Sequence, residues 1–159
     1  MSLQEELKKR EPFDSLAQEA MLAILRTSDL LENRVGRLLR DHGLTRSQYN
    51  VLRILRGEGR AMPSLEIADR MIQVAPAITR VVDQLVTAGH ATKTCNPDDR
   101  RVQLVEIRPS GRRLLQRLDA PVLDLHAQLL GGRSDGQLKQ LIRTLDDIRG
   151  DARAATPNE

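Results

Sequence analysis

Aromatic residues are almost absent from this sequence of 159 residues, which has no Trp, one Tyr and one Phe. Its apolar side chains are nearly all Leu, Ile, Val, Ala and Met, as in helix-packed cores. Cys95 is the only cysteine, which excludes an intramolecular disulfide and fits a reducing cytosol. No segment approaches the roughly 20 apolar residues of a membrane helix, and the charged N-terminus lacks the apolar run of a signal peptide. We therefore expect a cytoplasmic protein with no membrane partner.

The patterns of catalytic and metal sites are also missing. His42, His90 and His126 stand at unrelated spacings, whereas a metal site needs clustered ligands. No nucleophile triad, glycine-rich phosphate loop or paired-carboxylate motif stands out. We expect no enzyme activity, no metal and no cofactor.

The formal net charge of +3 is distributed unevenly along the chain. Residues 45 to 113 hold 12 Lys and Arg against 7 Asp and Glu, so this segment alone carries +5. A basic middle segment suits a polyanionic partner, although a solvated surface has the same composition.

Capping signals and apolar periodicity predict a mainly helical chain. Ser15, Thr45 and Ser134 each stand three residues before a Gln, which is the spacing of a capping box. The helix after Ser15 should end near Gly43, because glycine can take the left-handed conformation that closes a helix. From Ser110 the apolar spacing is helical again.

The middle of the chain predicts two short helices joined by a tight turn, followed by a β-hairpin. Ser64 should cap the first of these helices, and Gly89 should end the second. The expected elements are a short strand at 60–63, helices at 65–71 and 75–88, and strands at 90–95 and 101–107.

Apolar residues near the C-terminus exceed what one small domain can bury. Exposed, such a stripe would be a large apolar patch, so we expect a second copy of the chain to cover it. The stripe consists of Leu138, Leu141, Ile142, Leu145 and Ile148. We expect dimerisation helices at 1–43 and 110–150, a DNA-binding domain at 44–109, and a disordered tail at 151–159.

These features resemble the multiple antibiotic resistance regulator (MarR) family of bacterial winged-helix repressors. The matching segments are residues 44–55, 64–68, 75–85 and 96–111, of which the last is the most specific because it carries the Asp-x-Arg of the family's wing. The resemblance implies a mainly α fold with a small β-hairpin wing, that is, a winged helix-turn-helix with N- and C-terminal dimerisation helices. It also implies a homodimer that binds pseudo-palindromic double-stranded DNA, with a possible small-molecule effector.

The resemblance places the family's wing arginine on Arg101, where it would enter the minor groove while Asp99 orients it. It places the recognition helix on 75–88. The residues implied to contact DNA are Ser64, Gln73, Ala75, Pro76, Ala77, Thr79, Arg80, Asp99, Arg100 and Arg101. The chain departs from the family at Arg108, where a Ser or Thr cap is usual, so that Ser110 is expected to cap the next helix instead. The scarcity of aromatic residues argues against a stacked phenolic ligand.

Three alternatives remain open at the level of sequence. The wing arginines could merely pair with Asp98 and Asp99, and Arg80 could pair with Asp83 one turn away. The winged helix could bind an acidic protein in place of DNA. Cys95 could make the protein an oxidant-sensing regulator.

Overall fold

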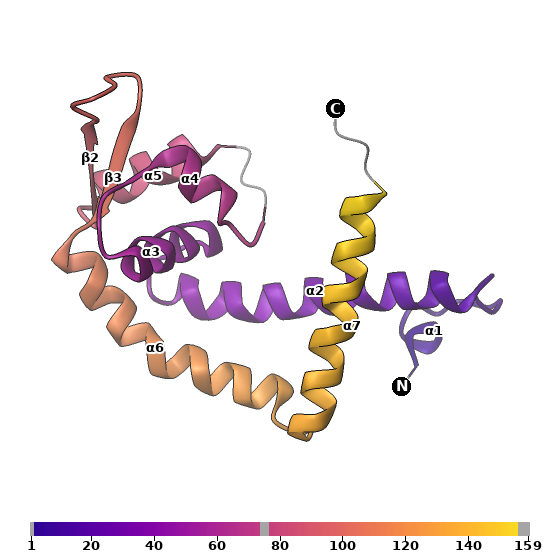
Figure 1. Ribbon diagram of the computed structural model, residues 1–159. Coiled ribbons are helices and arrows are strands. Elements are labelled where there is room, and N and C mark those ends of the chain that lie inside the picture. Colours follow the sequence, from indigo (N-terminus) through magenta and orange to yellow (C-terminus); the bar gives the residue numbers. More distant parts are fainter. Residues whose placement is uncertain (1, 74–76, 156–159) are drawn as a thin grey trace. The chain divides into compact units, whose positions relative to one another are not determined.

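The computed structural model describes residues 2–73 and 77–155. Its helices are α1 (Leu3–Glu6), α2 (Leu16–Arg40), α3 (Arg46–Glu58), α4 (Ser64–Asp69), α5 (Ile78–Thr87), α6 (Pro109–Leu130) and α7 (Asp135–Ala154), and its strands are β1 (Met62–Pro63), β2 (Ala91–Cys95) and β3 (Gln103–Ile107) (Figure 1). The chain divides into two compact units, Met1–Val122 and Leu123–Glu159, with α6 passing from the first to the second. The fold is therefore mainly helical with a small antiparallel sheet, as predicted.

The first unit is built on a winged helix-turn-helix. Its sheet has the order β1-β3-β2, in which β3 pairs with both neighbours and Lys93 lies opposite Val105. Helices α3, α4 and α5 pack against one another and against this sheet, while the far end of the β2–β3 hairpin stands clear of them (Figure 1). The hairpin is the predicted wing.

One apolar core fills the first unit. It joins the inner faces of α3 and α5 to β3 and to the first half of α6. The buried side chains are Leu39, Leu44, Val51, Leu52, Leu55, Met62, Ile67, Val82, Leu85, Ala91, Val105, Ile107, Leu114, Leu115, Leu118 and Val122. Because the apolar residues of α5 face this core, its polar residues are turned to solvent.

The helix ends follow local chemistry where a cap is present. Thr45 and Ser134 form complete capping boxes, and the Ser15 hydroxyl accepts from the Gln18 backbone N–H at 3.1 Å. Gly59 and Gly89 both take a φ of +74°, which halts α3 and α5.

Two predicted caps are wrong. Ser64 is the first residue of α4 rather than its cap, and its hydroxyl donates to the Gln103 carbonyl at 3.5 Å. Ser110 lies within the first turn of α6 and donates to the Gly89 carbonyl at 2.5 Å. Both hydroxyls thus bind segments that are distant in sequence, and a local sequence pattern cannot predict such contacts.

Several predicted boundaries also shift by one to four residues, among them the end of α4 at Asp69 and the start of β3 at Gln103, and the shifts in two longer helices bear on the argument. The recognition helix was expected from residue 75, but α5 begins at Ile78, and Ala77 before it offers no side-chain cap. At the other end of the chain, α7 continues to Ala154, so residues 151–154 are helical and not part of a disordered tail. None of the described helices is long and apolar enough to cross a membrane.

Candidate nucleic-acid interface

The outward face of α5 forms an open groove. Val82 and Leu85 are buried, which fixes the rotation of the helix and leaves its polar face free. The residues that line the groove are Ala77, Thr79, Arg80, Asp83, Gln84, Thr87 and Ala88. The structure therefore brings together three predicted DNA contacts, Ala77, Thr79 and Arg80, whereas the predicted contacts Ala75 and Pro76 lie outside the described residues.

Arg80 is available to a ligand on this face. Asp83, the partner that the sequence offered it, forms an ion pair with Lys93 of β2 instead. Within residues 2–73 and 77–155, Arg80 has no ion-pair partner. The Asp83–Lys93 pair also joins the recognition helix to the base of the wing, and sequence reasoning missed it because the two residues belong to different elements.

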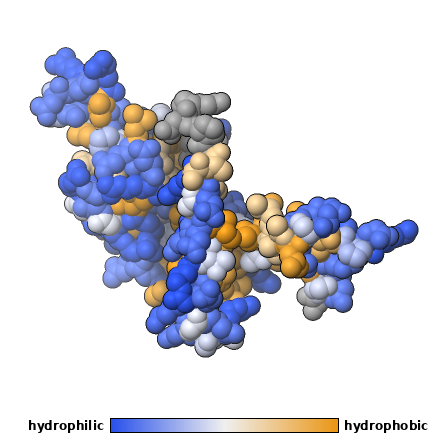
Figure 2. Space-filling model, turned by 45° about the vertical axis from the view of Figure 1, so that its right-hand side comes forward, coloured by the Kyte–Doolittle hydropathy of each residue, from blue (hydrophilic) through white to orange (hydrophobic). Residues whose placement is uncertain are grey.

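The turn of the wing is held by its own backbone and side chains. The Asn96 N–H donates to the Val102 carbonyl at 2.9 Å, and the Val102 N–H donates to the Asp99 carbonyl at 2.9 Å. The Asp98 N–H donates to the Asn96 side chain at 3.0 Å. These bonds give the end of the hairpin a defined shape, and Figure 2 shows that its surface is hydrophilic.

Asp99 holds Arg101 in the manner predicted. Its carboxylate accepts from the Arg101 backbone N–H at 3.0 Å and from Nε and Nη2 of the guanidinium, both at 3.1 Å. The Arg101 hydrogen bonds lower the pKa of Asp99, so the carboxylate stays charged. The Arg101 side chain is nevertheless 91% exposed. Asp99 thus fixes the orientation of the guanidinium through Nε and Nη2, while most of the Arg101 side chain remains open to an anionic partner.

Three other predicted contacts differ in their surroundings. Arg100 is exposed and has no ion-pair partner among the residues that the structure describes. Ser64 donates to Gln103, and the Gln73 amide donates to the carboxylate of Glu32 in α2. DNA contact by Ser64 or Gln73 stays a prediction, and it would compete with these internal bonds.

The candidate sites outside the DNA-facing surface are sparse. No group of three or more His, Cys, Asp or Glu within the described part of the chain could hold a metal ion. Cys95 ends β2 with an exposed thiol, to which the Gln103 amide donates at 3.3 Å.

The predicted dimerisation stripe is open in the single chain. Leu141, Ile142 and Ile148 of α7 are 45%, 57% and 39% exposed, and α7 has no buried residue. Helix α2 carries a second set of exposed apolar side chains, namely Leu16, Met21, Leu25 and Leu30, and Figure 2 shows hydrophobic surface on the N-terminal part of this helix.

Comparison with known proteins agrees with this geometry. A family model described as the MarR family matches residues 44–102. A crystal structure of a MarR transcription factor from Planctomyces limnophilus is 38% identical, covers 85% of this chain and 98% of its own, and superposes with a TM-score of 0.66.

Two further relatives extend the likeness. CouR from Rhodococcus jostii RHA1, solved bound to p-coumaroyl-CoA, is 25% identical over 92% of this chain and 100% of its own, with a TM-score of 0.73. The HTH-type transcriptional regulator PrsX of Escherichia coli is 24% identical over 70% of this chain and 68% of its own length.

Proposed function

We propose, from the premise that this chain belongs to the MarR family of DNA-binding transcriptional regulators, that it is a homodimeric repressor of a pseudo-palindromic operator. Each protomer places the outward face of α5 in a major groove and the Asp99–Arg101 turn in the neighbouring minor groove. The observation that carries this proposal is the exposed guanidinium of Arg101, which a carboxylate orients at the end of a projecting hairpin.

The physical argument starts from the electrostatics of the duplex. A narrow minor groove concentrates negative potential, so an inserted guanidinium is favoured there. Thr79 and Arg80 on α5 provide hydrogen-bond donors suited to base edges and phosphates. A two-fold dimer presents two such sets, which accounts for the expected symmetry of the operator.

Selection of bound sequences from random duplex DNA tests the proposal. The expected result is one enriched inverted repeat, whose affinity falls steeply and linearly on a plot of log affinity against log salt. Failure to enrich any sequence, together with capture of an acidic protein that Arg101→Ala abolishes, would replace the proposal with the protein-interaction alternative.

Release of the operator by a small molecule is part of the proposal. It is supported by CouR, which was solved with an acyl-CoA thioester. This chain supplies only Phe13 and Tyr49 for stacking a ring, so a ligand screen should include aliphatic acids and acyl thioesters beside phenolic acids.

Regulation by oxidation at Cys95 is the alternative within the same family. We expect Cys95→Ser to keep operator affinity and any effector response, because Cys95 is the single thiol of the sequence and a serine hydroxyl can also accept the hydrogen bond from Gln103. The measurement is operator binding before and after mild peroxide. If the wild type lost binding while Cys95→Ser retained it, the oxidant sensor would be the correct function.

A further inference from the structure

Glu32, near the middle of α2, gathers donors from three segments of the first unit. Its carboxylate accepts from Arg46 in the first turn of α3, from the side-chain amide of Gln73, and from the Ser28 hydroxyl at 3.4 Å. The hydrogen bond from Arg46 is the largest cause of the lowered pKa of Glu32, with smaller contributions from Gln73 and Ser28. The carboxylate is therefore charged and engaged throughout the neutral range.

The side chain of Arg46 passes beside Gly36 of α2 on its way to Glu32. Gly36 is buried one turn beyond Glu32, and a Cβ on Gly36 would lie 3.3 Å from Nη1 of Arg40 and in ordinary van der Waals contact, at 3.7 and 3.8 Å, with Cδ and Cγ of Arg46. The methylenes of Arg46 thus cross α2 at a position without a side chain, and its guanidinium arrives at Glu32.

Helix α5 begins without a local side-chain cap. Ala77, its N-cap residue, has no side-chain oxygen to bind the free backbone N–H groups of the first turn. Gln73 lies four residues before that cap, and its amide is fixed by Glu32. In the second half of α5, the Gln84 side chain accepts a hydrogen bond from Gln48 of α3 at 3.2 Å. Glu32 therefore contacts Gln73, four residues before the cap of α5, and Arg46 of α3, the helix that packs against α5.

We propose that Glu32 is a positioning residue for the recognition helix, acting through Gln73 and Arg46 and making no contact with DNA itself. This inference rests on the proposed function. It assigns to a carboxylate of α2 an influence, exerted through Gln73 and Arg46, on how α5 is presented to the operator.

The sign of the effect separates positioning from electrostatics. Removing a carboxylate from a DNA-binding protein lowers its repulsion of phosphates, which by itself tightens binding. Loss of a positioning contact has the opposite result, because α5 is then held less firmly in its binding geometry. A weaker complex after loss of a negative charge is thus evidence for positioning.

The experiment compares Glu32→Ala with Asp29→Ala, which removes a carboxylate of the same helix that contacts only Arg26 at 3.9 Å among the described residues. Operator affinity is measured by fluorescence anisotropy at two salt concentrations. Glu32→Ala should weaken binding on the order of tenfold with an unchanged salt slope. Asp29→Ala should leave binding unchanged or slightly tighter.

Two further variants locate the effect. In Glu32→Gln the amide oxygen still accepts a hydrogen bond, so affinity should lie between those of the wild type and Glu32→Ala. Gln73→Ala should also weaken binding, and the double variant should lose no more than the worse single variant, because both break one contact. Additive losses would mean that Gln73 contacts DNA independently, and they would overturn the inference.

Amide hydrogen exchange covers a failure of Glu32→Ala to fold. In Glu32→Gln, exchange should be faster at Gln73 and in the first turn of α5, while Leu114 and Leu118 in the core stay protected. Unchanged exchange and unchanged affinity in a variant that melts like the wild type would end the proposal and leave the function intact. A wild type that binds no DNA would instead remove both.

Discussion

At the scale of the residue, Arg101 and Asp99 illustrate how a short spacing can specify geometry. Two positions apart in a tight turn, they are close enough for a carboxylate to take both a backbone N–H and two guanidinium nitrogens. Charge-assisted pairing of this kind fixes the plane of the guanidinium as well as its position. An exposed arginine that is oriented in this way loses less freedom when it binds.

Arg101→Ala should weaken operator binding by about 1–3 kcal/mol per half-site and lower the salt slope by about one. Folding should be nearly untouched, because Arg101 is 91% exposed. Asp99→Ala should have a smaller effect, since it removes the orientation and keeps the charge. Anisotropy titrations at two salt concentrations measure both, with Arg143→Ala on α7 as the charge control. Equal affinities of Arg101→Ala and the wild type at both salts would exclude the wing as a DNA contact.

At Gly111, neighbouring atoms leave no room for a side chain. A Cβ there would lie 2.5 Å from the His90 carbonyl oxygen, 3.0 Å from Ile107 Cγ1 and 3.2 Å from Leu52 Cδ2. Gly111→Ala should therefore lower the free energy of unfolding by about 1–3 kcal/mol despite the better helix propensity of Ala.

The control for Gly111→Ala is Gly57→Ala in α3, where nothing lies within 4 Å of the added Cβ. This variant should instead raise the free energy of unfolding by about 0.5–1 kcal/mol. Urea denaturation measures both changes. A Gly111→Ala variant as stable as the wild type would mean that α6 can shift away from the His90 carbonyl without cost.

At the scale of the element, the sequence predicted structures whose cause is local. Thr45 and Ser134 cap their helices because the required Gln stands three residues later on the same chain. Ser64 and Ser110 have the same chemistry, yet their hydroxyls bind carbonyls that the fold brings close. The beginning of α5 was misplaced for a related reason, since no side chain caps it.

The contacts of the candidate site also differ in whether the sequence could predict them. The Asp99–Arg101 pair was predictable because it lies within one turn. The Asp83–Lys93 and Glu32–Gln73 contacts were not, because each joins two elements whose relative position depends on the packed core. Periodicity predicts which face of α5 is polar, but it cannot predict which of those polar side chains form ion pairs or hydrogen bonds with other parts of the protein.

The ion pair between α3 and α6 should make the free energy of unfolding depend on pH. Arg56 donates from two nitrogens to Asp119, each bond 2.8 Å long, and these bonds lower the pKa of Asp119 from its ordinary value of 3.8. A carboxylate whose pKa is lowered by folding stabilises the folded state above the unfolded pKa, and that stability is lost as the pH falls through the folded pKa.

Asp119→Asn should therefore lower the free energy of unfolding by about 0.5–1 kcal/mol at pH 7, a modest value because both side chains are partly exposed to solvent. The difference from the wild type should shrink below about pH 4 and vanish at lower pH. Denaturation at pH 7 and pH 2.5 measures it, with Asp124→Asn on the same helix as the control. A difference of equal size at both pH values would show that the ion pair does not stabilise the fold.

At the scale of the whole molecule, the single chain leaves apolar surface on the helices near both of its ends. Leu16, Met21 and Leu25 of α2 are 85%, 55% and 59% exposed, although the first unit has a complete core of its own. An exposed Leu is ordinary on a protein surface, but several large apolar side chains exposed on one helix favour our proposal that another chain covers this part of α2. Because α2 also carries Glu32, the two proposals, assembly through α2 and positioning of α5 by Glu32, concern the same helix.

The apolar stripe of α7 provides the test of assembly. Burial of one Leu or Ile contributes about 1.5–3 kcal/mol, so a dimer that covers this face on both protomers should be stable at micromolar concentration. Light scattering of the full chain should give twice the mass of 17.8 kDa. The double variant Leu141→Glu/Ile142→Glu should give a single chain or an aggregate, because it would bury four unpaired carboxylates per dimer.

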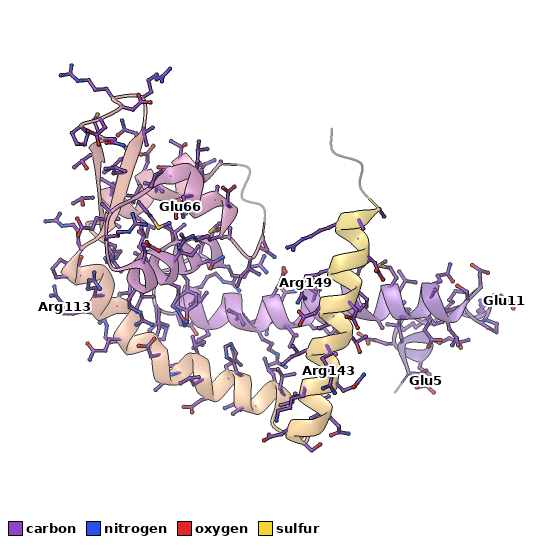
Figure 3. All side chains as sticks on the ribbon, in the orientation of Figure 1. Glu5, Glu11, Glu66, Arg113, Arg143 and Arg149 are labelled. Atoms are coloured by element: carbon purple, nitrogen blue, oxygen red, sulfur yellow. The ribbon has the colours of Figure 1, made fainter. Side chains whose placement is uncertain are left out.

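The matched control is Arg143→Glu/Asp147→Lys, which changes charges on the opposite face of α7, where Arg143 projects from the helix (Figure 3). This variant should remain dimeric, since an ideal helix places both residues away from the stripe. Variants that remain dimeric should keep their operator affinity, and variants that become monomeric should lose most of it. The reason is that two linked recognition helices bind a palindrome far more tightly than one does. A wild type that is monodisperse at the mass of one chain, and that still binds an inverted repeat, would refute the dimer. In that case the exposed stripe of α7 would have to face a different protein.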